Sequence, residues 1–244
     1  MEIVGQEIQI ASGQEKMGCY LAHPKTPGRY PAVVVTMEVV GLSDDIRHTS
    51  NQFAEQGFVA IAPNLYFRIP GPQTLPYGHL PEALKLAATL TDDGIVRDMS
   101  ATIDFVKDHP LSNGKVGVVG FCMGGRIAFL TACRNSTLNG AISFYGGGIL
   151  RAAQPGAAPA IDYLANLRAP MIAFFAGQDP HIPLSDGETI GARAKQLGKQ
   201  VEVRVYPEAG HGFMCENPAR GAYHEASAKD AWPRMLSFFR QHLG

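Results

Sequence analysis

The chain has 244 residues, of which 45% are hydrophobic and 18% charged, and its formal net charge is -1 at pH 7. A chain of this length and hydrophobic content is too apolar to be disordered and suits one α/β domain, so we expect a single domain over residues 1–244. The charge offers no clustered basic excess for nucleic acid or an anionic membrane, and the sequence therefore favours a small-molecule partner.

The N-terminus and the cysteines bear on the cellular compartment. Residues 1–14, MEIVGQEIQIASGQ, carry acidic residues where a secretion signal has basic ones, and no apolar run is long enough to span a membrane. The four cysteines are Cys19, Cys122, Cys133 and Cys215; they form no CxxC pair and have no histidine at zinc-ligand spacing. We expect free thiols in a cytoplasmic protein, a monomer or homodimer, without a metal or other cofactor.

Eight short runs have the composition of strands. The first two, residues 7–10 and 17–24, partly alternate between apolar and polar, and we expect them to form an antiparallel hairpin at the edge of the sheet. The central runs are almost continuously apolar, which is typical of parallel strands covered on both faces. The remaining six runs are residues 31–38, 58–66, 115–121, 140–146, 170–177 and 201–207.

Segments with helical spacing lie between these strands. Ser43 is the expected N-cap of the first helix, which places Ile46 and Phe53 on one face. In the last helix we expect Asp230 to be the cap, because Pro233 is tolerated in a first turn. The other helices are expected within residues 94–109, 124–133 and 185–198.

This alternation predicts an α/β fold with a mostly parallel central sheet of about eight strands and helices on both faces. Two loops, residues 67–82 and 146–162, are longer than usual and rich in glycine and proline. Both follow predicted strands, at the sheet edge where open α/β sheets bind ligands, so we expect them to wall the site.

The chemistry centres on GFCMGG, residues 120–125, which follows a predicted strand and opens a helix. Its G-x-Nuc-x-G form is that of a nucleophile elbow, with Cys122 at the bend and glycines where side chains would collide. Asp179 follows a later strand and His211 the next one, in the order nucleophile, acid, histidine that this fold requires.

The sequence resembles the dienelactone hydrolases, a branch of the α/β-hydrolase fold that uses cysteine in place of serine, over nearly the whole chain. The matching stretches are PAVVVTMEVVGL, FVAIAPNLYFR, SNGKVGVVGFCMGGRIAFL, YGGG, AGQDPHIP and YPEAGHGF. The resemblance implies a triad of Cys122, Asp179 and His211 that hydrolyses an ester or lactone through a thioester acyl-enzyme. It also implies that Glu38 contacts the resting thiol until substrate displaces it.

The residues support the same chemistry without the family. His211, oriented by Asp179, can accept the thiol proton of Cys122 and later protonate the leaving alkoxide. The amide of Met123 at the helix N-terminus, and that of Val39 in the loop after the third strand, are the expected oxyanion-hole donors. No metal or organic cofactor is required.

Each of these residues also has a simpler interpretation. Cys122 could fill a tight corner as a small apolar residue, Asp179 could cap a turn, and His211 could be a satisfied loop histidine. Glu38 could pair with Arg126 or Arg68 rather than approach the thiol. Cys215 lies close after His211 in sequence, and its role is open.

The substrate contacts follow the family less closely. Members that act on a free-acid lactone hold its carboxylate with two arginines, and here the position shortly after His211 is unmatched, with Arg220 the nearest candidate. Arg68 is a substrate-contact candidate that cannot be assumed to replace the second arginine. Phe67, Tyr77, Tyr145 and Phe213 would line an apolar pocket suited to a neutral ester or a hydrophobic lactone.

Three functions stay open on the sequence alone. The first is a cysteine-dependent ester or lactone hydrolase, and the second is a non-catalytic small-molecule-binding protein on the same fold. The third is a promiscuous enzyme that acts on phosphate or thioester substrates in the same site.

Overall fold

The computed structural model describes residues 1–244, and all eight strands belong to one sheet in the order β1-β2-β4-β3-β5-β6-β7-β8. The strands are β1 (Ile3–Ser12), β2 (Glu15–Pro24), β3 (Tyr30–Thr36), β4 (Val59–Pro63), β5 (Ser112–Phe121), β6 (Gly140–Phe144), β7 (Met171–Ala176) and β8 (Val201–Tyr206). β1 and β2 form the antiparallel edge hairpin, and every pair from β4 to β8 is parallel. The predicted mostly parallel sheet is therefore confirmed.

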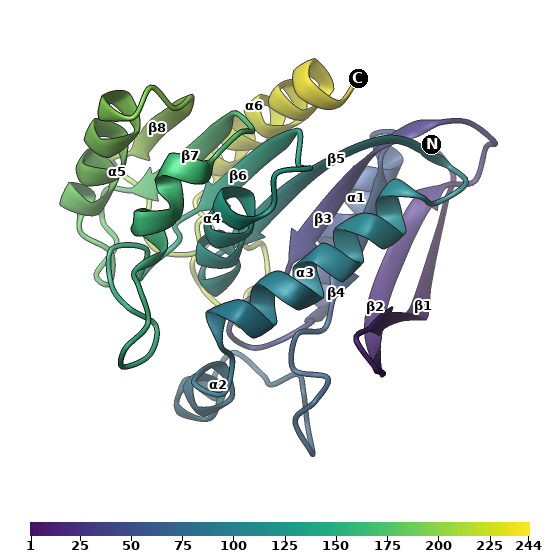
Figure 1. Cartoon of the computed structure of the whole chain (residues 1–244), viewed down its shortest axis with the longest axis horizontal. Helices are drawn as coiled ribbons and strands as arrows, with labels where there is room; N and C mark the ends of the chain where they lie inside the picture. The colour runs from purple at the N-terminus through teal and green to yellow at the C-terminus, as the bar shows by residue number, and fades with distance from the viewer.

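Helices cover both faces of the sheet (Figure 1). The helices α3 (Asp92–Lys107), α4 (Met123–Arg134) and α5 (Leu184–Gln196) lie on the near face in this view, and α1 (Asp44–Glu55) and α6 (Glu225–Leu243) lie behind the sheet. None of the helices has the length and hydropathy needed to cross a membrane.

Burial follows the expected pattern of a covered parallel sheet. Every residue of β4, β6 and β7 is buried, and these strands belong to one large hydrophobic cluster that also includes the inner faces of α3, α4 and α6. The buried strands fix the positions of the loops that follow them, and these loops hold the residues predicted to form the site.

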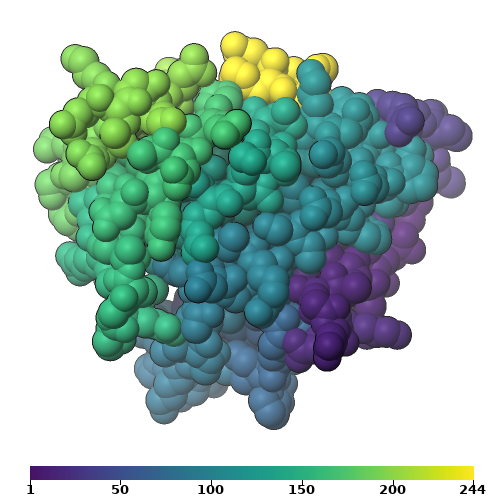
Figure 2. All heavy atoms as spheres, viewed as in Figure 1, coloured from purple at the N-terminus to yellow at the C-terminus, as the bar shows by residue number.

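The two long loops each contain a short helix. α2 (Leu80–Ala87) was not predicted; it closes the first loop and belongs to the blue segment that projects at the bottom of the molecule in Figure 2. Its eight residues are too few for a clear helical period, which is why the sequence suggested only a loop. The second loop contains a 3-10 helix at Ala160–Asn166.

One helix starts where the sequence predicts, without the expected capping bond, and another starts earlier than predicted. Ser43 stands at the N-cap of α1, but its side chain makes no capping hydrogen bond and its buried hydroxyl has no partner. α6 begins at Glu225, so Asp230 is not its cap and Pro233 lies inside the helix. The Asp230 carboxylate instead accepts hydrogen bonds from Tyr206 and Arg234, and this tertiary pairing competes with a capping role.

Candidate active site

Cys122 lies at a sharp bend between β5 and α4. Its backbone has φ 57° and ψ -124°, a conformation that costs a non-glycine residue about 1–3 kcal/mol and persists only where the surroundings impose it. A Cβ at Gly120 would collide with the Gly124 carbonyl and the Thr36 hydroxyl, so strand and helix can approach this closely only because both positions are glycine. The predicted elbow geometry is present.

His211 and Asp179 meet at the same edge of the sheet. Nδ1 of His211 lies 2.7 Å from Oδ2 of Asp179, whose side chain is only 1% exposed. The other carboxylate oxygen accepts hydrogen bonds from the amides of His181 and Ile182, at 2.8 and 3.2 Å. Asp179 is thus fixed by its own loop and holds the imidazole in one orientation.

The ionisation of this pair follows from its surroundings. Burial by itself would lower the pKa of His211, but its hydrogen bond with Asp179 and its interactions with Cys122 raise the pKa from 6.5 to about 9. For Asp179, burial would raise the pKa, but the hydrogen bonds from His211 and the two amides lower it overall. The interactions with Asp179 and Cys122 therefore make the His211 imidazole a stronger base than a free histidine, so that it holds a proton firmly once it has accepted one.

The backbone amides of Met123 and Val39, which are expected to bind an oxyanion, have no hydrogen-bond acceptor within the chain. The Tyr66 hydroxyl donates to the Val39 carbonyl at 2.9 Å and contacts the Met123 sulfur at 3.8 Å, so one side chain ties the two segments together. A Cβ at Gly124 would also come within 2.8 Å of the Met37 carbonyl, which shows how closely this loop packs on the start of α4.

Glu38 is buried and lies in a polar network. Its Oε1 pairs with the guanidinium of Arg220, and its Oε2 accepts a hydrogen bond from the Tyr77 hydroxyl at 2.8 Å. Both carboxylate oxygens are therefore engaged, and the partner is neither Arg126 nor Arg68. Arg220 reaches Glu38 across the backbone of Gly212, where φ is 87° and a Cβ would strike the guanidinium.

The structure argues against two of the four predicted substrate contacts. The Arg68 guanidinium forms salt bridges with the Asp98 and Glu15 carboxylates. Its hydrogen-bond donors are therefore already engaged by residues outside the triad. Phe213 has no exposed surface because its ring packs against Tyr145 and the core, which leaves nothing for a ligand to contact.

The two other predicted substrate contacts, Tyr145 and Phe67, differ in their burial and in their neighbours. Tyr145 is 1% exposed, its ring centroid lies 5.1 Å from that of His211, and its φ is 38°. The Tyr145 ring thus packs edge-on against the His211 imidazole. Phe67 is half-buried beneath the Arg68 guanidinium, which lies 4.0 Å from its ring centroid.

Sequence reasoning missed most of the network around Glu38. The Tyr77 hydroxyl also lies 2.8 Å from Asp45 Oδ2 and 3.5 Å from the Cys215 sulfur, and Asn217 donates to the same Asp45 oxygen. From the sequence we predict only an apolar pocket wall for Tyr77. The sequence does indicate that the loop of residues 67–82 is long enough to fold over the sheet edge. No sequence pattern, however, predicts which residues its side chains contact.

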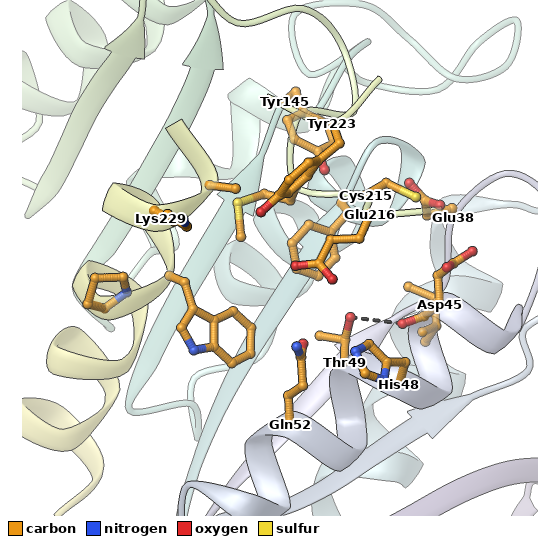
Figure 3. A pocket seen from close by; sticks show the side chains of 16 residues that line it. Glu38, Asp45, His48, Thr49, Gln52, Tyr145, Cys215, Glu216, Tyr223 and Lys229 are labelled. Carbon is orange, nitrogen blue, oxygen red and sulfur yellow. Dashed lines mark hydrogen bonds between the residues drawn. The ribbon is translucent and has the colours of Figure 1, made fainter. Parts of the chain in front are cut away.

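A cavity of about 330 Å³ opens between α1 and α6, next to this network (Figure 3). Its lining includes Glu38, Tyr145 and Cys215, but none of Cys122, Asp179 and His211. The cavity therefore adjoins the sheet edge that holds Cys122, Asp179 and His211, and Tyr145 contacts both.

Comparisons with known proteins agree on one family. The profile of the "Dienelactone hydrolase family" matches residues 17–243. A "Putative carboxymethylenebutenolidase" of Salmonella typhi is 34% identical over 237 residues, which is 96% of this chain and 86% of that protein. One of the same name from Synechocystis is 35% identical over 247 residues, with 99% and 95% of the two chains covered.

Solved structures show the same relationship. The crystal structure titled "Putative Dienelactone Hydrolase" from Klebsiella pneumoniae has a TM-score of 0.91 and 33% identity and covers 99% of this chain and all of that one. A dienelactone hydrolase-like promiscuous phosphotriesterase from metagenomic libraries has a TM-score of 0.83 over 99% of both chains, but at 19% identity it shows the fold alone.

Proposed function

Because the chain belongs to the dienelactone hydrolase family, whose members are carboxylic ester hydrolases, we propose that it hydrolyses esters or lactones with Cys122 as the nucleophile. The observation that carries this proposal is the strained backbone of Cys122 beside a His211–Asp179 pair whose imidazole is held by a buried carboxylate. A cysteine that served only as packing would not need such a backbone.

The first half of the reaction forms the acyl-enzyme. The Cys122 thiol gives its proton to His211, and the sulfur attacks the ester carbonyl, whose electron pair moves to oxygen. The amides of Met123 and Val39 are free to bind that oxyanion, and losing one such donor typically costs about a hundredfold or more in rate. When the intermediate collapses, the C–O bond breaks, His211 protonates the alkoxide, and a thioester remains on Cys122.

The second half returns the enzyme to its starting state. His211 takes a proton from water, and the resulting hydroxide adds to the thioester carbonyl. The C–S bond then breaks to release the carboxylic acid, and His211 returns its proton to the Cys122 sulfur. Asp179 stabilises the imidazolium that forms in both halves, since its buried carboxylate is fixed by two backbone amides.

The charges near the site favour a neutral substrate. Arg220 is the cation next to the triad, and Glu38 already neutralises it. Arg68 is engaged by Asp98, and the Arg126 side chain by Asp92. A substrate carboxylate would therefore have to displace Glu38 to find a guanidinium, whereas a neutral ester or lactone has no such requirement.

The test is turnover of a short aryl ester by purified wild type and Cys122→Ala. We expect the variant to lose about a thousandfold or more of kcat, because the nucleophile is gone. It should keep its thermal stability, because the substitution removes only the sulfur atom and leaves the Cβ and the backbone in place. Cys133→Ala is the matched control, because that thiol is buried in α4 and outside the site, and it should retain activity.

Two results would reject the proposal. One is ester turnover that survives in Cys122→Ala. The other is stoichiometric ligand binding by wild type with no turnover of any ester or lactone, which would instead support a binding protein on the same fold.

A further inference from the structure

The strand β8 forms one edge of the sheet and lies next to α5 (Figure 1). Gly177, at the end of β7, donates its amide hydrogen to the Tyr206 carbonyl of β8. A strand bonds to one neighbour with every second residue, so the amides and carbonyls of Val203 and Val205 point away from β7. None of the backbone hydrogen bonds from other segments reaches them, and this edge is therefore open to a further strand.

The two faces of β8 differ in chemistry. The odd positions are all valine and lie on the side of α5, where a Cβ at Gly191 would come 3.4 Å from the Val203 side chain. The even positions lie on the opposite face and are polar; they are Glu202, Arg204 and Tyr206. The helix on that face, α6, packs on β3, β5 and β6, so the charged side chains of β8 stay partly exposed. Val205 is 44% exposed, which is unusual for a valine in a strand.

The sequence of β8, VEVRVY, is self-complementary in one antiparallel register. When two copies pair about Val203, Glu202 of each lies opposite Arg204 of the other, and Val201 lies opposite Val205. A shift of two residues in either direction also pairs the outward-pointing groups, but it places Glu202 opposite its own copy or Arg204 opposite its own copy. Like charges across strands destabilise a pair, so the charges select the register centred on Val203. The other edge strand, β1, carries a single charged residue and has no such pattern.

The helix α5 fits the same axis. A two-fold axis at Val203, perpendicular to the sheet, places the α5 helices of both copies on one face and makes them antiparallel. Gly191, near the middle of α5, lies next to Val203, so the midpoint of the helix is level with this axis. The first half of α5 is acidic and the second half is basic; the charged residues are Asp186 and Glu188, then Arg193 and Lys195. Each half therefore lies beside the oppositely charged half of the other copy.

The distance between the two helices is that of packed helices. α5 packs on both β7 and β8. Neighbouring strands are about 4.8 Å apart, so a helix that covers this pair of strands lies about 10 Å from its symmetry copy. Helices in contact are typically about 8–10 Å apart. The same arrangement would thus bury helix surface together with the exposed Val205.

We propose that the protein forms a homodimer in which the β8 strands of two copies pair antiparallel about Val203 and join the two sheets into one. Backbone hydrogen bonds connect the two Val203 residues, and each Val205 amide donates to the partner's Val201 carbonyl. The contact contains none of Cys122, Asp179 and His211, so its test does not depend on ester hydrolysis.

The test is sedimentation equilibrium over a range of protein concentrations, with wild type expected to be a dimer. Glu202→Arg and Arg204→Glu each place like charges opposite one another, and each should raise the dissociation constant of the dimer about tenfold or more. When the two variants are mixed in equal amounts, the basic β8 of one meets the acidic β8 of the other. The mixture should therefore form a heterodimer with about the affinity of wild type.

Val205→Pro tests the backbone contact. It removes an amide hydrogen that has no acceptor within the chain, and proline is tolerated in an edge strand where the amide faces outward. The variant should keep the thermal unfolding temperature within a few degrees of wild type and should dimerise about tenfold or more weakly. Glu82→Arg, at an exposed position of α2, is the matched charge control and should remain a dimer.

Three results would overturn the proposal. The first is a monomeric wild type at every concentration, which would leave the β8 edge to a different partner. The second is unchanged dimerisation in Val205→Pro and in both charge variants, which would place the dimer contact elsewhere. The third is a mixture of Glu202→Arg and Arg204→Glu that associates no more tightly than either variant alone.

Discussion

At the scale of single residues, Glu38 has the most informative surroundings. Its carboxylate is 3% exposed and is held by Arg220 and Tyr77 rather than left free beside the thiol. Arg220 lies near enough to Cys122 for the two side chains to interact electrostatically. The Arg220 guanidinium also lies over the Tyr77 ring, 5.3 Å from its centroid. We therefore expect Glu38 to restrain the thiol, because it neutralises the cation that would otherwise stabilise a thiolate.

This arrangement predicts the effect of Glu38→Gln. Removing the carboxylate leaves Arg220 without its counter-ion, so the thiolate of Cys122 should be favoured and the thiol should react faster. We expect iodoacetamide to alkylate Cys122 several-fold faster at neutral pH, measured by peptide mass mapping so that Cys215 is scored separately.

Glu216→Gln serves as the matched control, because it removes a carboxylate from the outer rim of the cavity rather than from the thiol's surroundings. Its Cys122 alkylation rate should equal that of wild type. Equal rates for Glu38→Gln and wild type across pH would contradict a restraining role for Glu38.

At the scale of elements, one buried carboxylate attaches the edge hairpin to the rest of the fold. Asp98 on α3 accepts a hydrogen bond from Ser12 of β1 at 2.6 Å and two from Arg68, at 2.6 and 3.1 Å. Its side chain is 3% exposed. The residue therefore links β1, α3 and the loop that follows β4, and this explains why Arg68 is not free for a substrate.

Asp98→Ala should destabilise the protein by about 2–3 kcal/mol, because the buried Ser12 hydroxyl loses its partner and Arg68 keeps only the exposed Glu15 carboxylate. Urea unfolding measures this loss. Asp104→Ala, on an exposed position of the same helix, should change stability by less than about 0.5 kcal/mol. Similar losses for the two variants would show that the Asp98 cluster contributes nothing specific.

At the scale of the whole molecule, His211 makes folding stability depend on pH. Its pKa is raised from 6.5 to about 9 on folding, so the native state binds this proton more tightly than the unfolded chain. The resulting stabilisation is complete below pH 6.5 and is lost as the pH rises through 9. It amounts to at most about 3 kcal/mol.

His211→Asn should remove this dependence. Between pH 6.5 and 9 the free energy of unfolding of wild type should fall relative to that of the variant, as measured by urea unfolding at a series of pH values. His79→Asn, at an exposed loop position, should keep the wild-type slope. Parallel profiles for wild type and His211→Asn would mean that the His211 proton is not bound more tightly in the folded state.

Local sequence patterns were sufficient to predict the eight strands and the major helices, because hydrophobic periodicity and turn residues act within one element. They also identified the elbow, since the glycines at positions 120 and 124 are required by a contact between segments only a few residues apart. The same patterns failed for the start of α6, where Asp230 found partners on β8 and the following turn instead of capping the helix.

The sequence by itself thus determined the element order, the sheet edge at which Cys122, Asp179 and His211 meet, and the family. Only the tertiary structure decided which charges pair. Glu38 and Arg220 are 182 residues apart in sequence. Their contact requires the Arg220 side chain to pass over the backbone of Gly212, and no local sequence pattern predicts this. The cavity between α1 and α6 has the same origin, because its walls come from helices at opposite ends of the chain that meet only when both pack on the sheet.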